Sequence, residues 1–380
     1  MNIFLLAGEV SGDVLGGKLM ASLKSRGGDH LSMSGIGGAN MAAQGLDVLL
    51  PMEELNVMGI TEVLFQLPRL LKLMAGIVEE IETRQPDIVI TIDFPDFNFR
   101  LAERLKKRGI YKGKIIHYVA PTVWAWRPKR AQKIAKFLDG LLCLYPFEPE
   151  YFTPHGLPTC FTGHSIVEET PERSDPLAFR ASCAMADDTP TLGVFFGSRH
   201  GELKRLSKVI TETAEYVGEN VPNLHLIVPT LPHLEFDVRE ILDGCGLPYH
   251  ITVTADEKWS AFRACNAAVA VSGTVGLELS YAGVPHIIGY KTSMMNYTIA
   301  KMLVKTEYAH LGNILMQEPI VPEFIQGACK SEVMSAELID LLNDSGAQTT
   351  QRLAFQKLRT RLHNPERVAP SDKAAAFILG

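Results

Sequence analysis

Short apolar runs alternate with amphipathic segments through the first half of the chain. The apolar runs are rich in β-branched residues and end at turn residues, as is typical of strands buried in a sheet. These runs lie at residues 3–7, 31–36, 88–92, 114–119 and 140–144, and helical patterns lie at 14–24 and 101–108. Strands that alternate with helices predict an α/β fold with a parallel, doubly wound sheet.

The same alternation begins again after a polar, proline-containing stretch at 168–190. Strands are predicted at 191–196, 224–228, 251–253, 267–271 and 286–290, and a helix at 202–217. We therefore expect two Rossmann-like, doubly wound domains, 1–170 and 171–354, that face each other across a cleft. The helical tail at 355–380 is expected to pack back on the first domain or on a partner chain. Ligands of such folds bind beyond the carboxyl ends of the strands, so the turns there are the candidate sites.

Composition narrows the class of protein. The 380 residues carry a net charge of −6 with no long basic run, which argues against a general nucleic-acid binder. The six cysteines form no CxxC pair, so neither a zinc site nor a disulfide framework is indicated, and a reducing cytoplasm fits best. The N-terminal apolar run lacks a basic flank and predicts a strand rather than a signal peptide. No apolar stretch is long enough to span a bilayer, so any membrane role is expected to be peripheral.

A loop of small residues, Ser272, Gly273 and Thr274, follows the predicted strand 267–271 and begins a helix. Backbone N–H groups and the positive end of the helix dipole would favour a phosphate there. Glu278 lies about one and a half turns further on, where its carboxylate can accept hydrogen bonds from sugar hydroxyls. The loop therefore suggests a phosphorylated sugar or nucleotide. Ser and Thr also cap ordinary helices, and the loop alone leaves both interpretations open.

A second turn in the same domain, 197–200, follows the predicted strand 191–196. Ser198 is expected to cap the next helix, and Arg199 is free to reach a phosphate. Asn313 is a weaker candidate for the same nucleotide.

In the first domain, the turn after strand 3–7 carries Glu9, Ser11 and Asp13. Glu9 and Ser11 are expected to face the cleft, and Asp13 is expected to cap the helix that follows. The turn at Gly35–Gly38 resembles a dinucleotide fingerprint only loosely, because it follows the second strand and residue 40 is Asn.

Asp93 follows the apolar strand 88–92, and Pro95 is expected to hold Phe94 extended and so end the strand. Apolar neighbours would raise the pKa of the Asp93 carboxyl, which suits a general base acting on a hydroxyl. Asp96 is assigned mainly to helix capping, and it is also, with Glu9 and Ser11, a candidate contact for a bound sugar. Two carboxylates at this spacing without a third ligand are a weak metal signal, so no metal is expected.

The stretch 117–130 carries Trp124 and Trp126 beside Arg127, Lys129 and Arg130. Aromatic rings next to basic groups could bind a sugar face and a phosphate, or the stretch could simply begin a helix with a solvated basic face. His117 is expected to be a core histidine.

The stretch 57–78 is apolar over most of its surface, and Pro68 is expected to start a second helix within it. Such a helix is usually buried core, and on the residues alone we favour core. Basic interruptions leave docking on a membrane surface or on acyl chains open.

Together these motifs resemble one family, lipid-A-disaccharide synthase, which comprises inverting glycosyltransferases of GT-B architecture. The matching segments are LAGEVSGDVLG (6–16), MEELNVMGITEVL (52–64), IDFPDFN (92–98), HYVAPTVWAW (117–126), GSR (197–199), SGTVGLE (272–278) and LVKTEY (303–308).

The resemblance implies transfer of 2,3-diacylglucosamine from UDP-2,3-diacylglucosamine to 2,3-diacylglucosamine 1-phosphate (lipid X), which yields a β-1,6 disaccharide 1-phosphate and UDP without a cofactor. It implies that Asp93 is the essential carboxylate. The residues it places on the UDP side are Ser198, Arg199, Ser272, Gly273, Thr274, Glu278 and Asn313. The residues it places on a surface for acyl chains or membrane are Met58, Val63, Leu64, Leu67, Leu70 and Leu71, which reverses the preference for core.

The family resemblance further implies a homodimer that exchanges C-terminal parts, located in the cytoplasm at the inner-membrane surface. The chain departs from the family pattern at Phe196, Gly312 and Thr122. These departures affect the expected geometry around Arg199 and Asn313 but not the expected reaction. The alternatives are an enzyme like UDP-N-acetylglucosamine 2-epimerase, a non-catalytic UDP-sugar-binding protein and a nicotinamide oxidoreductase. The oxidoreductase would need a glycine fingerprint after the first strand, and that fingerprint is missing.

Overall fold

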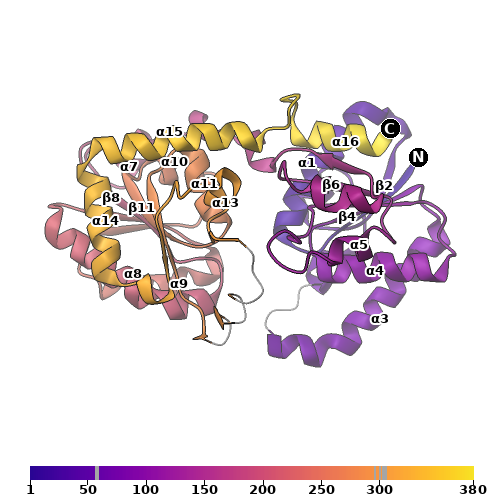
Figure 1. Cartoon of the computed structure of the whole chain (residues 1–380), viewed down its shortest axis with the longest axis horizontal. Coiled ribbons are helices and arrows are strands. Elements are labelled where there is room, and N and C mark those ends of the chain that lie inside the picture. The colour runs from indigo at the N-terminus through magenta and orange to yellow at the C-terminus, as the bar shows by residue number, and fades with distance from the viewer. Residues whose placement is uncertain (56–59, 295–296, 299–300, 302–305) are drawn as a thin grey trace. The chain divides into compact units, whose positions relative to one another are not determined.

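The computed structural model describes residues 1–55, 60–294, 297–298, 301 and 306–380. These residues form two compact units (Figure 1). The first unit comprises residues 1–168 and 362–380, and the second comprises residues 169–361. The border lies two residues before the expected one at 170. The expected tail is divided, since 355–361 remains in the second unit and 362–380 belongs to the first.

The first unit is built on a seven-stranded sheet in the order β3-β2-β1-β4-β5-β6-β7. All its strand pairs are parallel. The strands are β1 (Asn2–Ala7), β2 (Ser32–Gly37), β3 (Asp47–Pro51), β4 (Ile88–Ile92), β5 (Lys114–Tyr118), β6 (Gly140–Cys143) and β7 (Thr159–Phe161). The chain runs outward from β1 to one edge and then from β4 to the other, so the sheet is doubly wound as predicted. The order reverses between β1 and β4, where such sheets bind ligands.

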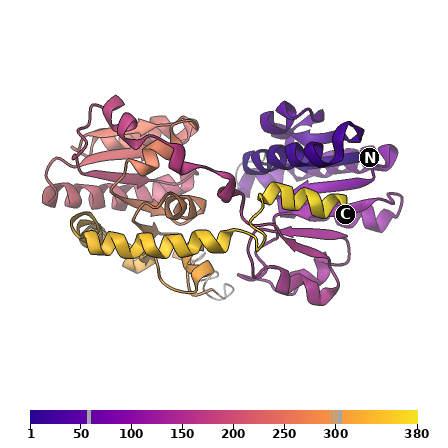
Figure 2. The ribbon, with the colours of Figure 1, turned by 90° about the horizontal axis from the view of Figure 1, so that it is seen from above.

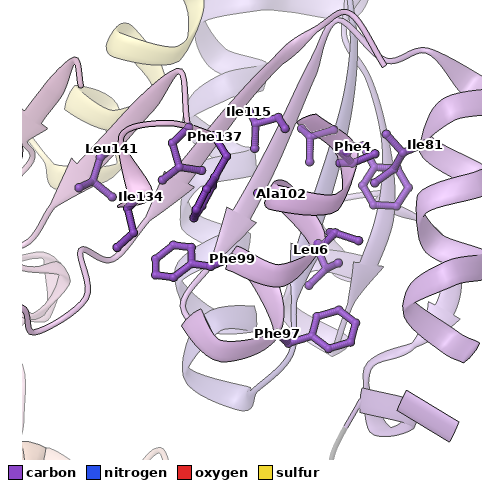
Figure 3. Close-up of a cluster of buried hydrophobic side chains, with 14 of the residues drawn as sticks. Phe4, Leu6, Ile81, Phe97, Phe99, Ala102, Ile115, Ile134, Phe137 and Leu141 are labelled. Atoms are coloured by element: carbon purple, nitrogen blue, oxygen red, sulfur yellow. The ribbon is translucent and has the colours of Figure 1, made fainter. Parts of the chain in front are cut away.

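Helices cover both faces of this sheet. They are α1 (Val10–Gly27), α2 (Ala39–Ala43), α3 (Ile60–Arg84), α4 (Pro95–Arg108), α5 (Arg130–Ile134), α6 (Pro149–Phe152) and α16 (Pro370–Leu379). On one face, Figure 3 shows Phe4 and Leu6 of β1 beside Ile81 of α3 and Phe97 of α4. On the other face, α16 lies alongside α1 (Figure 2). The last helix of the chain thus completes the core of the first unit.

Pro68 lies inside α3, which runs from Ile60 to Arg84 as one helix. The prediction that Pro68 starts a second helix is therefore wrong. A proline removes one backbone hydrogen bond, and helices tolerate this by bending when tertiary contacts hold them. Those contacts come from the C-terminal half of α3, where Met74, Val78 and Ile81 are buried against the sheet.

The second unit has a six-stranded parallel sheet in the order β10-β9-β8-β11-β12-β13. Its strands are β8 (Thr191–Phe195), β9 (His225–Pro229), β10 (Tyr249–Thr252), β11 (Ala267–Val271), β12 (His286–Tyr290) and β13 (Glu323–Ile325). Its helices are α7 (Pro176–Ser182), α8 (His200–Asn220), α9 (Glu235–Asp243), α10 (Lys258–Arg263), α11 (Thr274–Ala282), α13 (Leu311–Met316), α14 (Ser331–Asn343) and α15 (Ser345–Leu362). This sheet also reverses its order, between β8 and β11, so it repeats the doubly wound plan. Within the described residues, no helix is both long and apolar enough to cross a membrane.

Candidate active site

Asp93 directly follows β4 in an unusual backbone conformation. Asp93 and Phe94 both have positive φ, 50° and 48°, in the left-handed region that non-glycine residues rarely adopt. The expectation that Pro95 keeps Phe94 extended is therefore wrong. Hydrogen bonds hold the turn instead, since the N–H of Asp93 donates to the carbonyl of Tyr118 over 2.9 Å. Each such residue costs about 1–3 kcal/mol and persists only where the surroundings fix it, as at functional sites.

The Asp93 carboxylate lies at the point where the sheet order reverses. Ser11, in the first turn of α1, donates a hydrogen bond of 3.4 Å to its Oδ2. Burial raises the pKa of Asp93, and hydrogen bonds from the Phe94 backbone and from Ser11 oppose that rise. Glu9 is exposed just before α1. Glu9, Ser11 and Asp93 therefore follow the neighbouring strands β1 and β4, and Asp93 has the electrostatic character of a proton acceptor.

Asp13 has a structural role different from the expected one. Its buried carboxylate accepts hydrogen bonds from the N–H groups of Gly38 (2.7 Å) and Met41 (3.0 Å) and from Asn40. Burial alone would raise the pKa of Asp13, but these hydrogen bonds together hold it below its usual value. Asp13 thus caps α2, and the prediction that it caps its own helix is wrong. Its carboxylate also accepts the N–H of Gly38 at the end of the Gly35–Gly38 turn, where a dinucleotide phosphate would bind.

Asp96 is exposed and pairs with Arg130, with 3.0 Å between Oδ1 and Nη2. No side chain caps α4 by a hydrogen bond at its N-terminal residue, Phe94. The expected capping by Asp96 is therefore not present, although a carboxylate in the first turn still favours the helix dipole. The ion pair joins the turn that carries Asp93 to the stretch that follows β5.

The stretch 117–130 divides into a buried and an exposed part. His117 is fully buried, 2.7 Å from the Thr91 hydroxyl, and burial lowers its pKa to about 3, which confirms it as a core histidine. Trp124 is also buried, and its Nε1 donates to Glu148 over 3.3 Å. Trp126 remains half-buried with the Arg127 guanidinium 4.2 Å from its ring centroid. Of the two tryptophans, Trp126 is therefore the one that can meet a ligand.

Glu148 is a buried carboxylate that the sequence did not single out. It accepts hydrogen bonds from the N–H groups of Leu144 (2.9 Å) and Tyr145 (3.0 Å) and from Trp124. Burial raises its pKa to about 7, against the lowering effect of these hydrogen bonds. No local pattern distinguishes it from a surface glutamate, because its burial and its contact with Trp124 depend on the tertiary structure.

In the second unit, Gly273 precedes α11 and no side chain caps that helix by a hydrogen bond. Ser272 instead donates from Oγ to the carbonyl of Ala309 over 3.2 Å. Gly273 and Thr274 are exposed. The capping interpretation of this loop is therefore wrong, and no side chain occupies the N–H groups at the start of α11 as a cap.

Glu278 is half-buried in α11 and forms an ion pair of 2.7 Å with Lys258. The pair involves Oε1 of the carboxylate, and a carboxylate has a second oxygen that can accept further hydrogen bonds.

Arg199, rather than Ser198, is the residue that precedes α8. The expected capping by Ser198 is wrong, because no side chain caps α8 by a hydrogen bond. Glu202 in the first turn accepts the Ser198 N–H over 3.3 Å. The Arg199 side chain is 81% exposed, 3.7 Å from Glu202. Since β8 and β11 are neighbours, the turn at 197–199 and the loop at 272–274 follow adjacent strands.

Asn313 is fully buried. Its Nδ2 donates to the carbonyl of Val321 and to Glu323 Oε1, both over 2.8 Å, and its Oδ1 accepts the Val321 N–H over 3.0 Å. These contacts occupy the amide, so they support a positioning role rather than direct contact with a nucleotide. Glu323 also accepts the N–H groups of Ala309 and His310, both over 2.9 Å. Glu323 therefore holds the segment that contacts Ser272, and sequence analysis missed it because β13 was missed.

A groove of about 500 Å³ lies in the first unit beside α3. Its lining is mainly apolar, with basic side chains among it: Phe4, Ile36, Leu49, Leu50, Arg69, Lys72, Leu73, Gly76, Ile77 and Glu80. Of the expected acyl or membrane surface, Leu70 is half-buried and Leu71 is 43% exposed. Met58 lies outside the described residues, as do the side chains of Val63, Leu64 and Leu67. Across the part of the chain that the structure describes, no cluster of His, Cys, Asp and Glu fits a metal ion.

Comparison with known proteins identifies the family. A profile described as lipid-A-disaccharide synthetase matches residues 3–378. A relative from Rhodospirillum centenum, named lipid-A-disaccharide synthase, is 42% identical over 378 residues, which cover 99% of this chain and 94% of the relative. A relative of the same name from Paramagnetospirillum magneticum is 41% identical and covers 100% of this chain and 98% of its own.

Solved structures share the fold at low identity. A UDP-GlcNAc 2-epimerase from Neisseria meningitidis, bound to UDP-GlcNAc, has a TM-score of 0.62 at 10% identity and covers 100% of this chain and 98% of its own. MurG from Acinetobacter baumannii has a TM-score of 0.58 at 12% identity, with 100% and 99% covered. These similarities, with the two parallel sheets, place the chain in the GT-B architecture.

Proposed function

The chain belongs to the lipid-A-disaccharide synthetase family, and we propose that it transfers 2,3-diacylglucosamine from UDP-2,3-diacylglucosamine to 2,3-diacylglucosamine 1-phosphate (lipid X). The products are the β-1,6 disaccharide 1-phosphate and UDP. It is a glycosyltransferase, and the epimerase alternative is not favoured, because the relatives that match the whole chain are named synthases.

The observation that carries the proposed mechanism is the position of Asp93. Its carboxylate ends β4 in a turn fixed by backbone hydrogen bonds, and burial raises its pKa. We assign Asp93 as the general base that takes the proton from the 6-hydroxyl of the acceptor. The hydroxyl oxygen then attacks the anomeric carbon of the donor, and the bond from that carbon to the UDP oxygen breaks. Glu9, Ser11 and Asp96 are assigned to contacts with the acceptor.

The second unit is assigned to the donor. The N-terminus of α11 with Ser272, Gly273 and Thr274, and the turn with Ser198 and Arg199, would stabilise the charge that develops on the departing diphosphate. Glu278 would accept hydrogen bonds from the ribose. Asn313 is assigned to positioning, because its amide binds Val321 and Glu323.

The contacts with lipid are proposed for the first unit. The groove beside α3 is mainly apolar, which suits an acyl chain, and Lys72 in its lining suits an anionic lipid head group. We assign the surface of α3, with Leu70 and Leu71, to acyl chains at the inner-membrane surface. A homodimer and a cytoplasmic location at that membrane are part of the same proposal.

The test is to incubate the purified protein with UDP-2,3-diacylglucosamine and the monosaccharide 1-phosphate in detergent micelles. Mass spectrometry should find a disaccharide monophosphate and an equal amount of UDP. Product without added metal, after treatment with EDTA, is expected. Formation of a 2-epimer from the donor alone would favour the epimerase, and no reaction with both substrates would favour a binding protein.

A further inference from the structure

A hollow of about 580 Å³ lies where the chain enters α5 in the first unit. Four of its five lining residues are cations: Arg127, Pro128, Lys129, Arg130 and Lys133. From its charge and its place in the sheet, we infer that this hollow, the basic hollow, binds the phosphate of the acceptor sugar. The inference rests on the proposed function, since it assigns the phosphate end of that acceptor.

Two of the cations already have carboxylate partners. Arg130 pairs with Asp96 over 3.0 Å, and Lys133 pairs with Glu103 over 3.0 Å. No ion pair of Arg127 or Lys129 with a carboxylate occurs among the described residues. Two positive charges therefore remain, and a sugar phosphate monoester carries about two negative charges at neutral pH.

The backbone and ring contacts of Arg127 prepare it to bind an anion. Its φ is 55°, in the left-handed region, although it is neither glycine nor asparagine. Such strain is concentrated at functional positions. Its guanidinium lies 4.2 Å from the centroid of the Trp126 ring, which restricts the side chain before a ligand binds. A planar guanidinium held in this way can donate two parallel hydrogen bonds to phosphate oxygens.

The basic hollow is connected to the turn that carries the base. β4 and β5 are neighbouring parallel strands, so the segments that follow them leave the same edge of the sheet. The N–H of Asp93 donates to Tyr118, the last residue of β5. Arg130 reaches back to Asp96, three residues after Asp93. In the acceptor, one sugar ring carries both the 6-hydroxyl and the 1-phosphate. When the 6-hydroxyl lies at Asp93, the phosphate is therefore only about the width of that ring away.

The test compares two acceptors in micelles, the diacylglucosamine 1-phosphate and the same lipid without phosphate. Arg127→Ala and Lys129→Ala should each raise the KM for the phosphorylated acceptor by at least about tenfold, as expected when a charge-assisted hydrogen bond is lost. The KM for the donor and the kinetics with the phosphate-free acceptor should stay unchanged. Lys136→Ala, an exposed lysine just beyond α5 that does not line the hollow, is the matched control.

Arg127→Lys separates folding from recognition, because it keeps the charge and loses the paired donors. It should give an intermediate KM with an unchanged circular dichroism spectrum. Equal losses with both acceptors, or a wild-type enzyme that does not distinguish them, would overturn the inference. So would unchanged kinetics in micelles together with weaker binding to phosphatidylglycerol vesicles, since the hollow would then contact membrane. Failure of the proposed function is a different result, in which the wild-type protein forms disaccharide from neither acceptor.

Discussion

The buried side-chain amide of Asn98 donates a hydrogen bond to the backbone carbonyl of Asp93, with 2.7 Å between Nδ2 and O. Asn98 lies in the first turn of α4 and is fully buried. Together with the bond from the Asp93 N–H to Tyr118, it fixes both peptide groups of a residue with φ of 50°. The carboxylate therefore leaves a backbone that is held on both sides, as the proposed proton transfer in a defined direction requires.

Asp93→Asn should lower kcat at least about a hundredfold, the usual size of a general-base effect. The same change should raise the free energy of unfolding at neutral pH, because burial disfavours the ionised carboxyl. Steady-state kinetics and urea unfolding measure the two effects. Asp188→Asn, at an exposed aspartate in the loop before β8, is the control and should change neither. A nearly normal rate in the folded Asp93 variant would reject the assignment.

The pH dependence follows from the raised pKa of Asp93. A base works when ionised, so kcat/KM should fall on acidification at a pH above the ordinary aspartate range of about 3.9. Ser11 lowers this pKa by its hydrogen bond, so Ser11→Ala should move the acidic limb to still higher pH. Ser25→Ala, at an exposed serine near the end of α1, should leave it in place. A limb that moves down in Ser11→Ala would contradict this account.

The same shift makes a prediction about stability. A carboxyl with a raised folded-state pKa favours the folded state most at pH below the unfolded pKa. This contribution is lost as pH rises through the folded pKa. The free energy of unfolding of Asp93→Asn should therefore exceed that of the wild type by more and more as pH rises from the unfolded-state pKa to the folded-state pKa of Asp93. Urea unfolding of both proteins at a series of pH values measures this difference. A difference that does not change with pH would argue that the pKa of Asp93 is not raised.

Gly8→Ala should displace Phe94 and with it the turn that carries Asp93. A Cβ at residue 8 would lie 2.5 Å from Cδ1 of the Phe94 ring, so the ring must move. We expect kcat to fall by about tenfold or more, since small misplacements of a catalytic group are costly. Gly244→Ala is the control, because the nearest atom to its Cβ would be 3.7 Å away. Unchanged kinetics in Gly8→Ala would show that the position of Phe94 does not matter.

Asn313→Ala tests positioning against direct binding. Loss of the amide removes both hydrogen bonds to the Val321 backbone and one of the hydrogen bonds to the Glu323 carboxylate, which should cost about 1–3 kcal/mol of stability. Denaturant unfolding measures this cost, and the KM for the UDP-sugar gives the comparison. A raised donor KM at unchanged stability would instead mean that Asn313 contacts the nucleotide.

Among the described strands, the central ones were predictable, whereas the edge strands apart from β10 were not. The predicted limits of β4, β11 and β12 agree with the structure because these strands are apolar runs flanked by turns. The missed strands were β3, β7 and β13, which lie at sheet edges and pair on one side only. Such strands need fewer buried side chains, so β7 and β13 are three residues long and half-buried throughout. Missing β13 also removed Glu323 from the candidate site.

By itself, the sequence determined the doubly wound plan of both units and the placement of Asp93 and of residues 272–274 after buried strands. Those features follow from hydrophobic periodicity and small-residue turns, which are local properties of the chain. Tertiary structure decided the partners of each polar side chain. Asp13 caps α2, Asn313 turns inward to Val321, and the last helix completes the core of the first unit. Such partners come from segments far apart in sequence that strand order brings together, and no local pattern encodes that order.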